Sequence, residues 1–116
     1  MSAQWDITID QGGTVDLVFT WLEADQVTPV NLAGFTAEMQ VRDRPGGEVL
    51  YATYSTGNGA ITLGGDLGTI TLTVAASVTA AYTFDGGVYD LQLTDGYGNV
   101  TVLLSGLFTV QAAVTT

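Results

Sequence analysis

Alternation of apolar and polar residues, interrupted at short intervals by turn residues, constrains the fold more than any other feature of this 116-residue sequence. Trp5, Ile7 and Ile9 alternate with polar residues, which is typical of a strand with one buried face. The same spacing recurs between residues 15 and 21, and again between residues 35 and 43. Clusters of glycine, asparagine and aspartate separate these segments. The pattern therefore predicts an all-β chain of short strands.

Seven or eight strands with turns every eight to twelve residues or so indicate a β-sandwich or barrel. The expected strands cover residues 4–10, 15–21, 35–43, 48–54, 61–63, 70–74, 88–94 and 100–110. One short helical turn is expected between Ala75 and Tyr82, with Ser77 available as its N-cap. Trp5 and Trp21 share the phase of the core residues, so we expect both to pack inside. The chain is predicted to be one domain, 1–116, with residues 111–116 as a flexible tail.

The segment from Asp85 to Leu91 makes the fold prediction more specific. It follows the expected helical turn and has the D-x-G-x-Y-x-C spacing that leads into strand F of immunoglobulin domains, with leucine in place of cysteine. Tyr89 would then form a tyrosine corner, its hydroxyl bonding back to the main chain. The chain has no cysteine, and Met39 stands where antibody domains carry tryptophan. We therefore predict an Ig-like antiparallel β-sandwich rather than an antibody-type domain.

The charge composition narrows the classes of partner. The chain has no lysine, and its two basic residues, Arg42 and Arg44, are outnumbered by twelve acidic residues, which gives a net charge of −10. Such a surface repels nucleic-acid phosphates and anionic membranes, and it suits a basic partner. No apolar run approaches the ~20 residues of a membrane span, and the N-terminus lacks the features of a signal peptide. We expect a protein made in a cytoplasm.

The residue inventory argues against catalysis. Histidine, cysteine and lysine are absent, so the usual general base, the thiol nucleophile and the Schiff-base amine are all missing. A carboxylate pair remains conceivable among Asp6, Asp10, Asp16, Asp90 and Asp95. These residues fall on polar strand faces or in turns, where solvated surface is the favoured interpretation. No catalytic residue and no cofactor is predicted.

The residues leave two binding chemistries to consider, and the first is calcium binding by carboxylates in the loops. Asp95 and Asn99, with Asp66 or Asp85 nearby, offer oxygen ligands for calcium, but a glycine-rich hairpin turn explains the same residues. We therefore predict no metal site.

The aromatic residues suggest a sugar-stacking platform or a protein interface. Tyr54, Tyr82 and Tyr97 are the expected surface candidates. Asp6, Asp10 and Asp16 are the candidate charged contacts, since they lie on the polar faces of the first two strands. The first and last strands, 4–10 and 100–110, are the expected sheet edges, where strand addition could occur.

The order of these segments resembles a family of small virion proteins of tailed bacteriophages. The similarity extends to the N-terminal β-sandwich domain of siphophage upper baseplate proteins and covers nearly the whole chain. It is carried by the segments WDITIDQG (5–12), PVNLAGFTA (29–37), MQVR (39–42), GTITL (68–72) and YDLQLTD (89–95).

This resemblance implies assembly rather than catalysis, and it brings no catalytic residues with it. The chain is then expected to be a structural component of the capsid, neck, tail or baseplate. Its partners would be other virion proteins in multiple copies, and its location the virion. The alternative is a carbohydrate-binding or host-attachment module.

Overall fold

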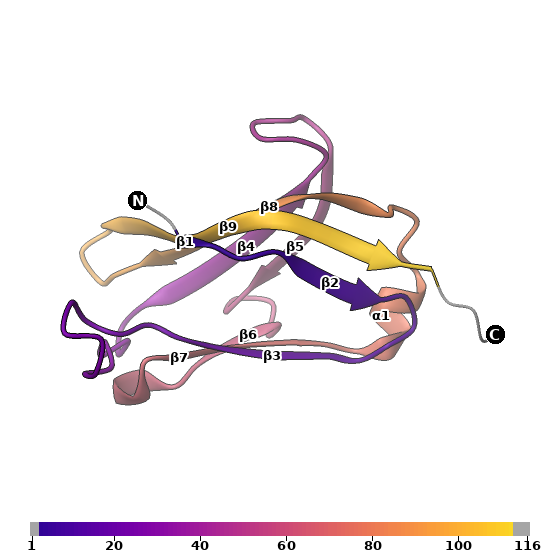
Figure 1. Ribbon diagram of the computed structural model, residues 1–116. Helices are drawn as coiled ribbons and strands as arrows, with labels where there is room; N and C mark the ends of the chain where they lie inside the picture. Colours follow the sequence, from indigo (N-terminus) through magenta and orange to yellow (C-terminus); the bar gives the residue numbers. More distant parts are fainter. Residues whose placement is uncertain (1–2, 113–116) are drawn as a thin grey trace.

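The computed structural model describes residues 3–112 and shows two facing β-sheets (Figure 1). Nine strands, one α-helix and one 3₁₀ turn lie within this range, against seven or eight strands predicted, because the first strand is broken at Trp5 and Asp6. The elements are β1 (Ala3–Gln4), β2 (Ile7–Asp10), β3 (Val15–Thr20), β4 (Thr36–Arg42), β5 (Leu50–Ser55), β6 (Ile61–Leu63), η1 (Gly65–Leu67), β7 (Thr69–Val74), α1 (Ala76–Ala80), β8 (Gly86–Thr94) and β9 (Val100–Gln111).

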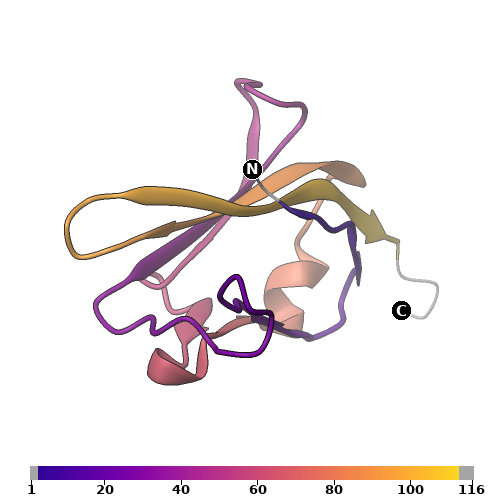
Figure 2. The same ribbon diagram turned by 60° about the vertical axis from the view of Figure 1, so that its left-hand side comes forward.

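The larger sheet has the order β1/β2-β9-β8-β4-β5, and the smaller sheet has the order β3-β7-β6. All pairs are antiparallel except those of β1 and β2, which run parallel to β9. In immunoglobulin lettering, the smaller sheet is B-E-D and the larger is C′-C-F-G with the first strand joined to G. The predicted all-β, Ig-like sandwich is confirmed, and Figure 2 shows the two layers from a second side.

The core lies between the sheets and follows the alternation of the sequence. Ile7 and Ile9 are buried, as are Leu91 and Leu93 on β8. On β4 the buried residues alternate as predicted, and Met39, opposite Leu91, is 1% exposed. A period of two along each strand thus places every second side chain inside, which accounts for the correct core assignments.

A β-bulge on β5 re-aims an aromatic side chain. The register shifts between Val41 and Arg42, so Tyr51 is the extra residue on β5. Its ring stacks on that of Phe84, with centroids 4.5 Å apart. A Cβ at Gly87 would lie 2.2 Å from the Arg42 carbonyl oxygen and 3.3 Å from the Tyr51 ring. Glycine at position 87 therefore permits this packing.

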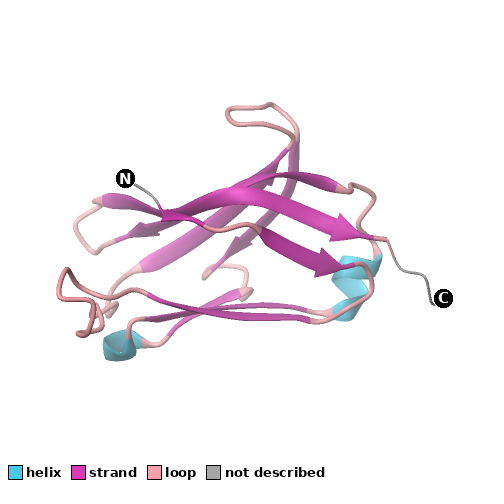
Figure 3. Ribbon diagram, in the orientation of Figure 1, coloured by secondary structure: helices cyan, strands magenta, loops and turns pink. Residues whose placement is uncertain are grey.

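The helical turn differs from the prediction in its cap. α1 has Ala75 as its N-cap residue, with no side-chain hydrogen bond, so the assignment of Ser77 was wrong. The helix is held by Thr79, which is fully buried: its hydroxyl donates to the Gly13 carbonyl (2.8 Å) and accepts from the Gly12 N–H (3.1 Å). Figure 3 shows α1 beside the turn that joins β2 to β3. A tertiary contact thus anchors the helix, whose N-terminus has no side-chain cap.

Three further predictions need correction. β9 lies inside the larger sheet, between β8 and the β1/β2 strand, so the last strand is not an edge. Trp5 is 57% exposed, because it lies at the break between β1 and β2, and its ring packs edge-on against Phe19. Strand β9 continues to Gln111, which the prediction placed in the tail, and residues 113–116 lie outside the described part.

Across residues 3–112, no helix has the length and apolar character needed to cross a membrane.

Candidate functional site

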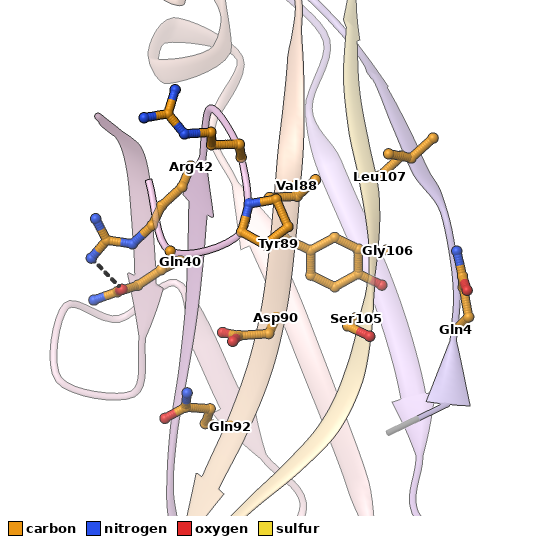
Figure 4. A pocket seen from close by; sticks show the side chains of 13 residues that line it. Gln4, Gln40, Arg42, Val88, Tyr89, Asp90, Gln92, Ser105, Gly106 and Leu107 are labelled. Atoms are coloured by element: carbon orange, nitrogen blue, oxygen red, sulfur yellow. Dashed lines mark hydrogen bonds between the residues drawn. The ribbon is translucent and has the colours of Figure 1, made fainter. Parts of the chain in front are cut away.

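A groove crosses the outer face of the larger sheet, and its cavity volume is about 560 Å³ (Figure 4). Its floor consists of outward-facing side chains of β4, β8 and β9, while β1 and the turn after β4 form its sides. Both arginines of the chain belong to it. The lining residues are Gln4, Gln40, Arg42, Arg44, Pro45, Gly46, Val88, Tyr89, Asp90, Gln92, Ser105, Gly106 and Leu107.

The two arginines of the groove differ in freedom. The Arg42 guanidinium donates to Gln40 Oε1 (2.9 Å) and to the Gly47 carbonyl (3.1 Å), which fixes its position. The side chain of Arg44 is 73% exposed and lies 3.6 Å from the Asp43 carboxylate. An exposed pair of this kind is weak. Arg44 can therefore turn toward an incoming carboxylate, whereas Arg42 offers a preset donor.

The groove is lined mainly by hydrogen-bonding and apolar groups. Gln40, Gln92 and Ser105 supply hydrogen-bonding groups, and Leu107, 53% exposed, supplies an apolar edge. Among the described residues that line it, Asp90 is the one carboxylate. Acid–base chemistry with two carboxylates would need a second one nearby. The groove is therefore suited to holding a polar chain or surface.

Tyr89 fastens the N-terminal strand behind this groove. It is 3% exposed, and its hydroxyl donates to the Trp5 carbonyl. Figure 4 shows its ring directed from β8 toward Gly106. Asp6 Oδ1 accepts the Leu107 N–H (3.0 Å), so a side chain carries the ladder across the break between β1 and β2. Burial, and then the charge of Asp6, raise the pKa of Tyr89 to about 12.

This arrangement differs from a tyrosine corner, in which the hydroxyl bonds to main chain a few residues upstream. Here the partner lies 84 residues upstream, on the first strand. The sequence located a buried structural tyrosine but not its partner, because local spacing cannot show which distant strand lies beside β8.

Tyr54 is not a surface residue, and its prediction as a surface contact was wrong. It lies opposite Met39 in the β4–β5 pair, so its side chain enters the core and is 4% exposed. Its hydroxyl lies 2.5 Å from that of Tyr82, which is half-buried. Burial raises the pKa of Tyr54, and the hydrogen bond to Tyr82 and the charge of that phenol add to the effect.

The paired phenols border a second cavity, of about 450 Å³, between β5 and α1. Tyr51, Tyr54 and Tyr82 give it aromatic walls, and Val78 of α1 is exposed at 46% beside them. One hydroxyl proton is used between the two phenols. The other can face the cavity, where it could hydrogen-bond to a small ring-shaped ligand.

Tyr97 is exposed, consistent with the prediction, and sits at the tip of the β8–β9 hairpin with 94% of its surface accessible. Beside it, Asp95 Oδ1 accepts the N–H groups of Tyr97 (2.8 Å) and Asn99 (2.9 Å), and Asp95 Oδ2 accepts from Asn99 Nδ2. These bonds to Asn99 lower the pKa of Asp95. The carboxylate is thus turned into its own loop, as the turn interpretation requires.

Metal ligands do not gather on these loops. No group of three or more acidic side chains within residues 3–112 is placed to hold a metal ion.

The three predicted acidic contacts are exposed and lie on or next to β2 and β3, the two strands that the turn at residues 11–14 joins. Asp6 lies before β2, Asp10 ends β2, and Asp16 lies on β3. Asp10 follows the buried Ile9 on the larger sheet and Asp16 follows the buried Val15 on the smaller sheet, so their side chains leave the core on the outer faces of different sheets. Asp6 has a structural bond as well, through its contact with Leu107.

No family model matches the chain, and no curated protein matches it. Among solved structures, similar shapes include the extracellular domains 3–5 of Drosophila OTK, at 16% identity and a TM-score of 0.40. That match covers 95% of this chain, which spans only 33% of the OTK chain. The extracellular domain of a voltage-gated sodium channel β4 subunit, described in parallel homodimers, matches at 12% identity and a TM-score of 0.45, covering 98% of this chain and 96% of that one. At these scores the likeness carries no argument about partners.

Proposed function

We propose that the chain is a non-catalytic structural component of a tailed-phage virion that acts through contacts with other virion proteins, present in multiple copies. The observation that carries this proposal is the outer face of the larger sheet. Its groove of about 560 Å³ is lined by both arginines, and no described element covers it. The sequence resemblance to phage virion proteins supports the location.

The composition of the groove favours a protein partner over a nucleic acid or a membrane. Arginine is enriched at protein interfaces, and the amide and hydroxyl groups here can pair with an exposed main chain. The net charge of −10 opposes binding to phosphate-rich surfaces. Together with the resemblance to virion proteins, this leads us to propose that the chain is made in the host cytoplasm and functions on the particle.

Mass spectrometry of purified particles tests this function directly, and absence of the chain from them would overturn it. Site-specific photocrosslinking locates the contact. A photoreactive residue at Gln92, inside the groove, should give adducts with other virion proteins. The matched control at Thr62, exposed on β6 of the opposite sheet, should give few or none.

A second candidate is a carbohydrate-binding or host-attachment module, and the cavity with the paired phenols of Tyr54 and Tyr82 favours it. A glycan array probes this candidate. Reproducible binding that Tyr82→Phe removes and Tyr97→Phe leaves intact would support a sugar site in the cavity. Loss with Tyr97→Phe alone would place the contact at the hairpin tip instead.

A further inference from the structure

The edge strand β3 has main-chain groups that no other part of the described chain uses. The Trp21 N–H donates to the Gly68 carbonyl (2.9 Å), which sets the phase of the β3–β7 ladder. Main-chain groups alternate in direction along an antiparallel strand. Those of Asp16, Val18 and Thr20 therefore face away from β7, and they have no hydrogen-bond partner among residues 3–112.

The neighbouring edge of the larger sheet is open in the same direction. The N–H groups of Trp5 and Gln11 donate to β9, at Ser105 (2.9 Å) and Gln111 (2.8 Å). By the same alternation, the main chain of Thr8 faces away from β9. Figure 1 shows β2 and β3 lying one above the other on the same side of the molecule. This side, called here the open side, is defined by β2, β3 and Trp5.

The open side combines apolar and negative groups. Trp5 and Val18 are 57% and 60% exposed, and Trp5 covers Phe19 edge-on at a centroid distance of 6.3 Å. Asp10 and Asp16 stand on its two strands. The only arginines of the chain line the groove on the outer face of the larger sheet, so they do not neutralise these carboxylates.

We propose that the open side accepts an extended segment of a basic partner protein, which adds to β3 as a fourth strand of the smaller sheet. This inference rests on the proposed assembly function and names the chemistry of the partner. Strand addition derives affinity from main-chain hydrogen bonds and specificity from alternate side chains. Apolar side chains of the segment would cover Phe19 and Trp5, and its cations would lie beside Asp16 on the other face.

Charge decides between this partner and a second copy of the chain. Two copies would each bring a net charge of −10 to the contact. Like charges in adjacent strands are destabilising. A lysine- or arginine-bearing strand removes this repulsion, and long-range attraction would speed its association at low salt.

An NMR titration of the full chain tests the proposal with a synthetic probe, a ten-residue peptide of alternating valine and lysine. In the free chain, the amide protons of Leu17 and Phe19 should exchange slowly and those of Asp16, Val18 and Thr20 quickly. Saturating peptide should slow the exchange of these three amides at least tenfold. Unchanged exchange at all three would overturn strand addition to β3.

Two matched pairs of variants separate the main-chain from the charge contribution. Val18→Pro removes an outward N–H without a ladder bond, so it should weaken peptide binding at least tenfold. Thr53→Pro removes an outward N–H from the opposite edge strand, β5, and should leave binding unchanged. Asp16→Asn should weaken binding about two- to fivefold, as for an exposed ion pair. Asp66→Asn, on the distant 3₁₀ turn, should have no effect.

Three control results would overturn the proposal. The first is a peptide of alternating valine and glutamate that binds as tightly as the valine–lysine peptide. The second is a valine–lysine peptide, N-methylated on alternate residues, that binds as tightly as the unmethylated one. The third is a homodimer of the chain that protects the same three amides without peptide. The first contradicts charge selection, the second main-chain pairing, and the third a heterologous partner. Failure of the function is distinguishable, because a chain absent from purified particles can still bind the peptide.

Discussion

The two long edge strands, β5 and β3, differ in whether their outward main-chain groups have hydrogen-bond partners. On β5 the outward Ser55 N–H donates to Asn58 Oδ1 (3.0 Å), and the outward Thr53 carbonyl accepts from Asn58 Nδ2 (2.9 Å). One side-chain amide thus occupies the place of a neighbouring strand. The described residues around β3 contain no such group, and its outward main chain stays unpaired.

The difference shows how a sheet edge is closed or left available. A side-chain amide carries an acceptor and a donor, like a peptide group, so Asn58 can pair with the Ser55 N–H and the Thr53 carbonyl of β5 without a further strand. Natural sheets protect edges that are not meant to pair. The protected edge of β5 and the unprotected edge of β3 direct strand addition to the open side.

The largest loss of stability is expected from a substitution at Gly106, the position on β9 where the first strand packs closest. A Cβ at Gly106 would lie 2.4 Å from the Trp5 carbonyl oxygen, so Gly106→Ala must displace the strand beside the open side. We expect the free energy of unfolding to fall by about 2–3 kcal/mol. Urea denaturation measures it. At Gly57, which has 3.7 Å to its nearest neighbour, Gly57→Ala should change stability by under about 0.5 kcal/mol.

Tyr89→Phe tests the bond that ties the same strand to β8. It removes the hydroxyl that donates to the Trp5 carbonyl, and we expect a loss of about 1–2 kcal/mol in the same denaturation experiment. Tyr97→Phe is the control, since Tyr97 is exposed and should be neutral. A denaturation midpoint for Tyr89→Phe equal to that of the control would show that this bond does not hold the first strand.

The same tyrosine predicts how stability changes in alkaline solution. Its folded-state pKa is raised to about 12, above the ordinary value of 10.0. Its contribution is therefore complete below about pH 10 and is lost as the pH rises toward 12. Unfolding followed between pH 9 and 12 should show a shallower loss for Tyr89→Phe than for the wild type. Parallel curves would assign the alkaline loss to other groups.

Asn58→Ala should turn β5 into an edge like β3. Three hydrogen bonds of an exposed side chain are lost, including one from the Ala60 N–H, and the expected cost is about 1 kcal/mol. Self-association through β5 should then appear in sedimentation experiments at high salt. There the Debye screening length falls to about 3 Å, so the repulsion between acidic copies weakens. Monomers at every salt concentration would show that Asn58 is not what keeps this edge closed.

Much of the sandwich could be predicted from local sequence. The spacing of Ile7 and Ile9, and of Leu91 and Leu93, fixes which faces enter the core, because successive strand residues point to opposite sides. The glycine-rich turns place most strand ends within a few residues. The exposure of Tyr97 follows from its position in a hairpin turn.

The candidate surfaces were less predictable. Tyr54 was expected outside and lies inside, because its direction depends on its pairing with Met39. Trp5 was expected inside and is exposed, because the strand breaks where Asp6 replaces a main-chain acceptor. The closure of β5 by Asn58 has no signal in composition or periodicity.

By itself, then, the sequence determined the strand period, the fold class and the acidic character of the surface. Each depends on residues close together in the chain or on simple counts. Only the tertiary structure decided that β9 lies inside its sheet, that Tyr89 reaches Trp5, and that β3 rather than β9 is left open. These features depend on which distant segments become neighbours, and strand pairing is set by the energy of the whole core rather than by any local pattern.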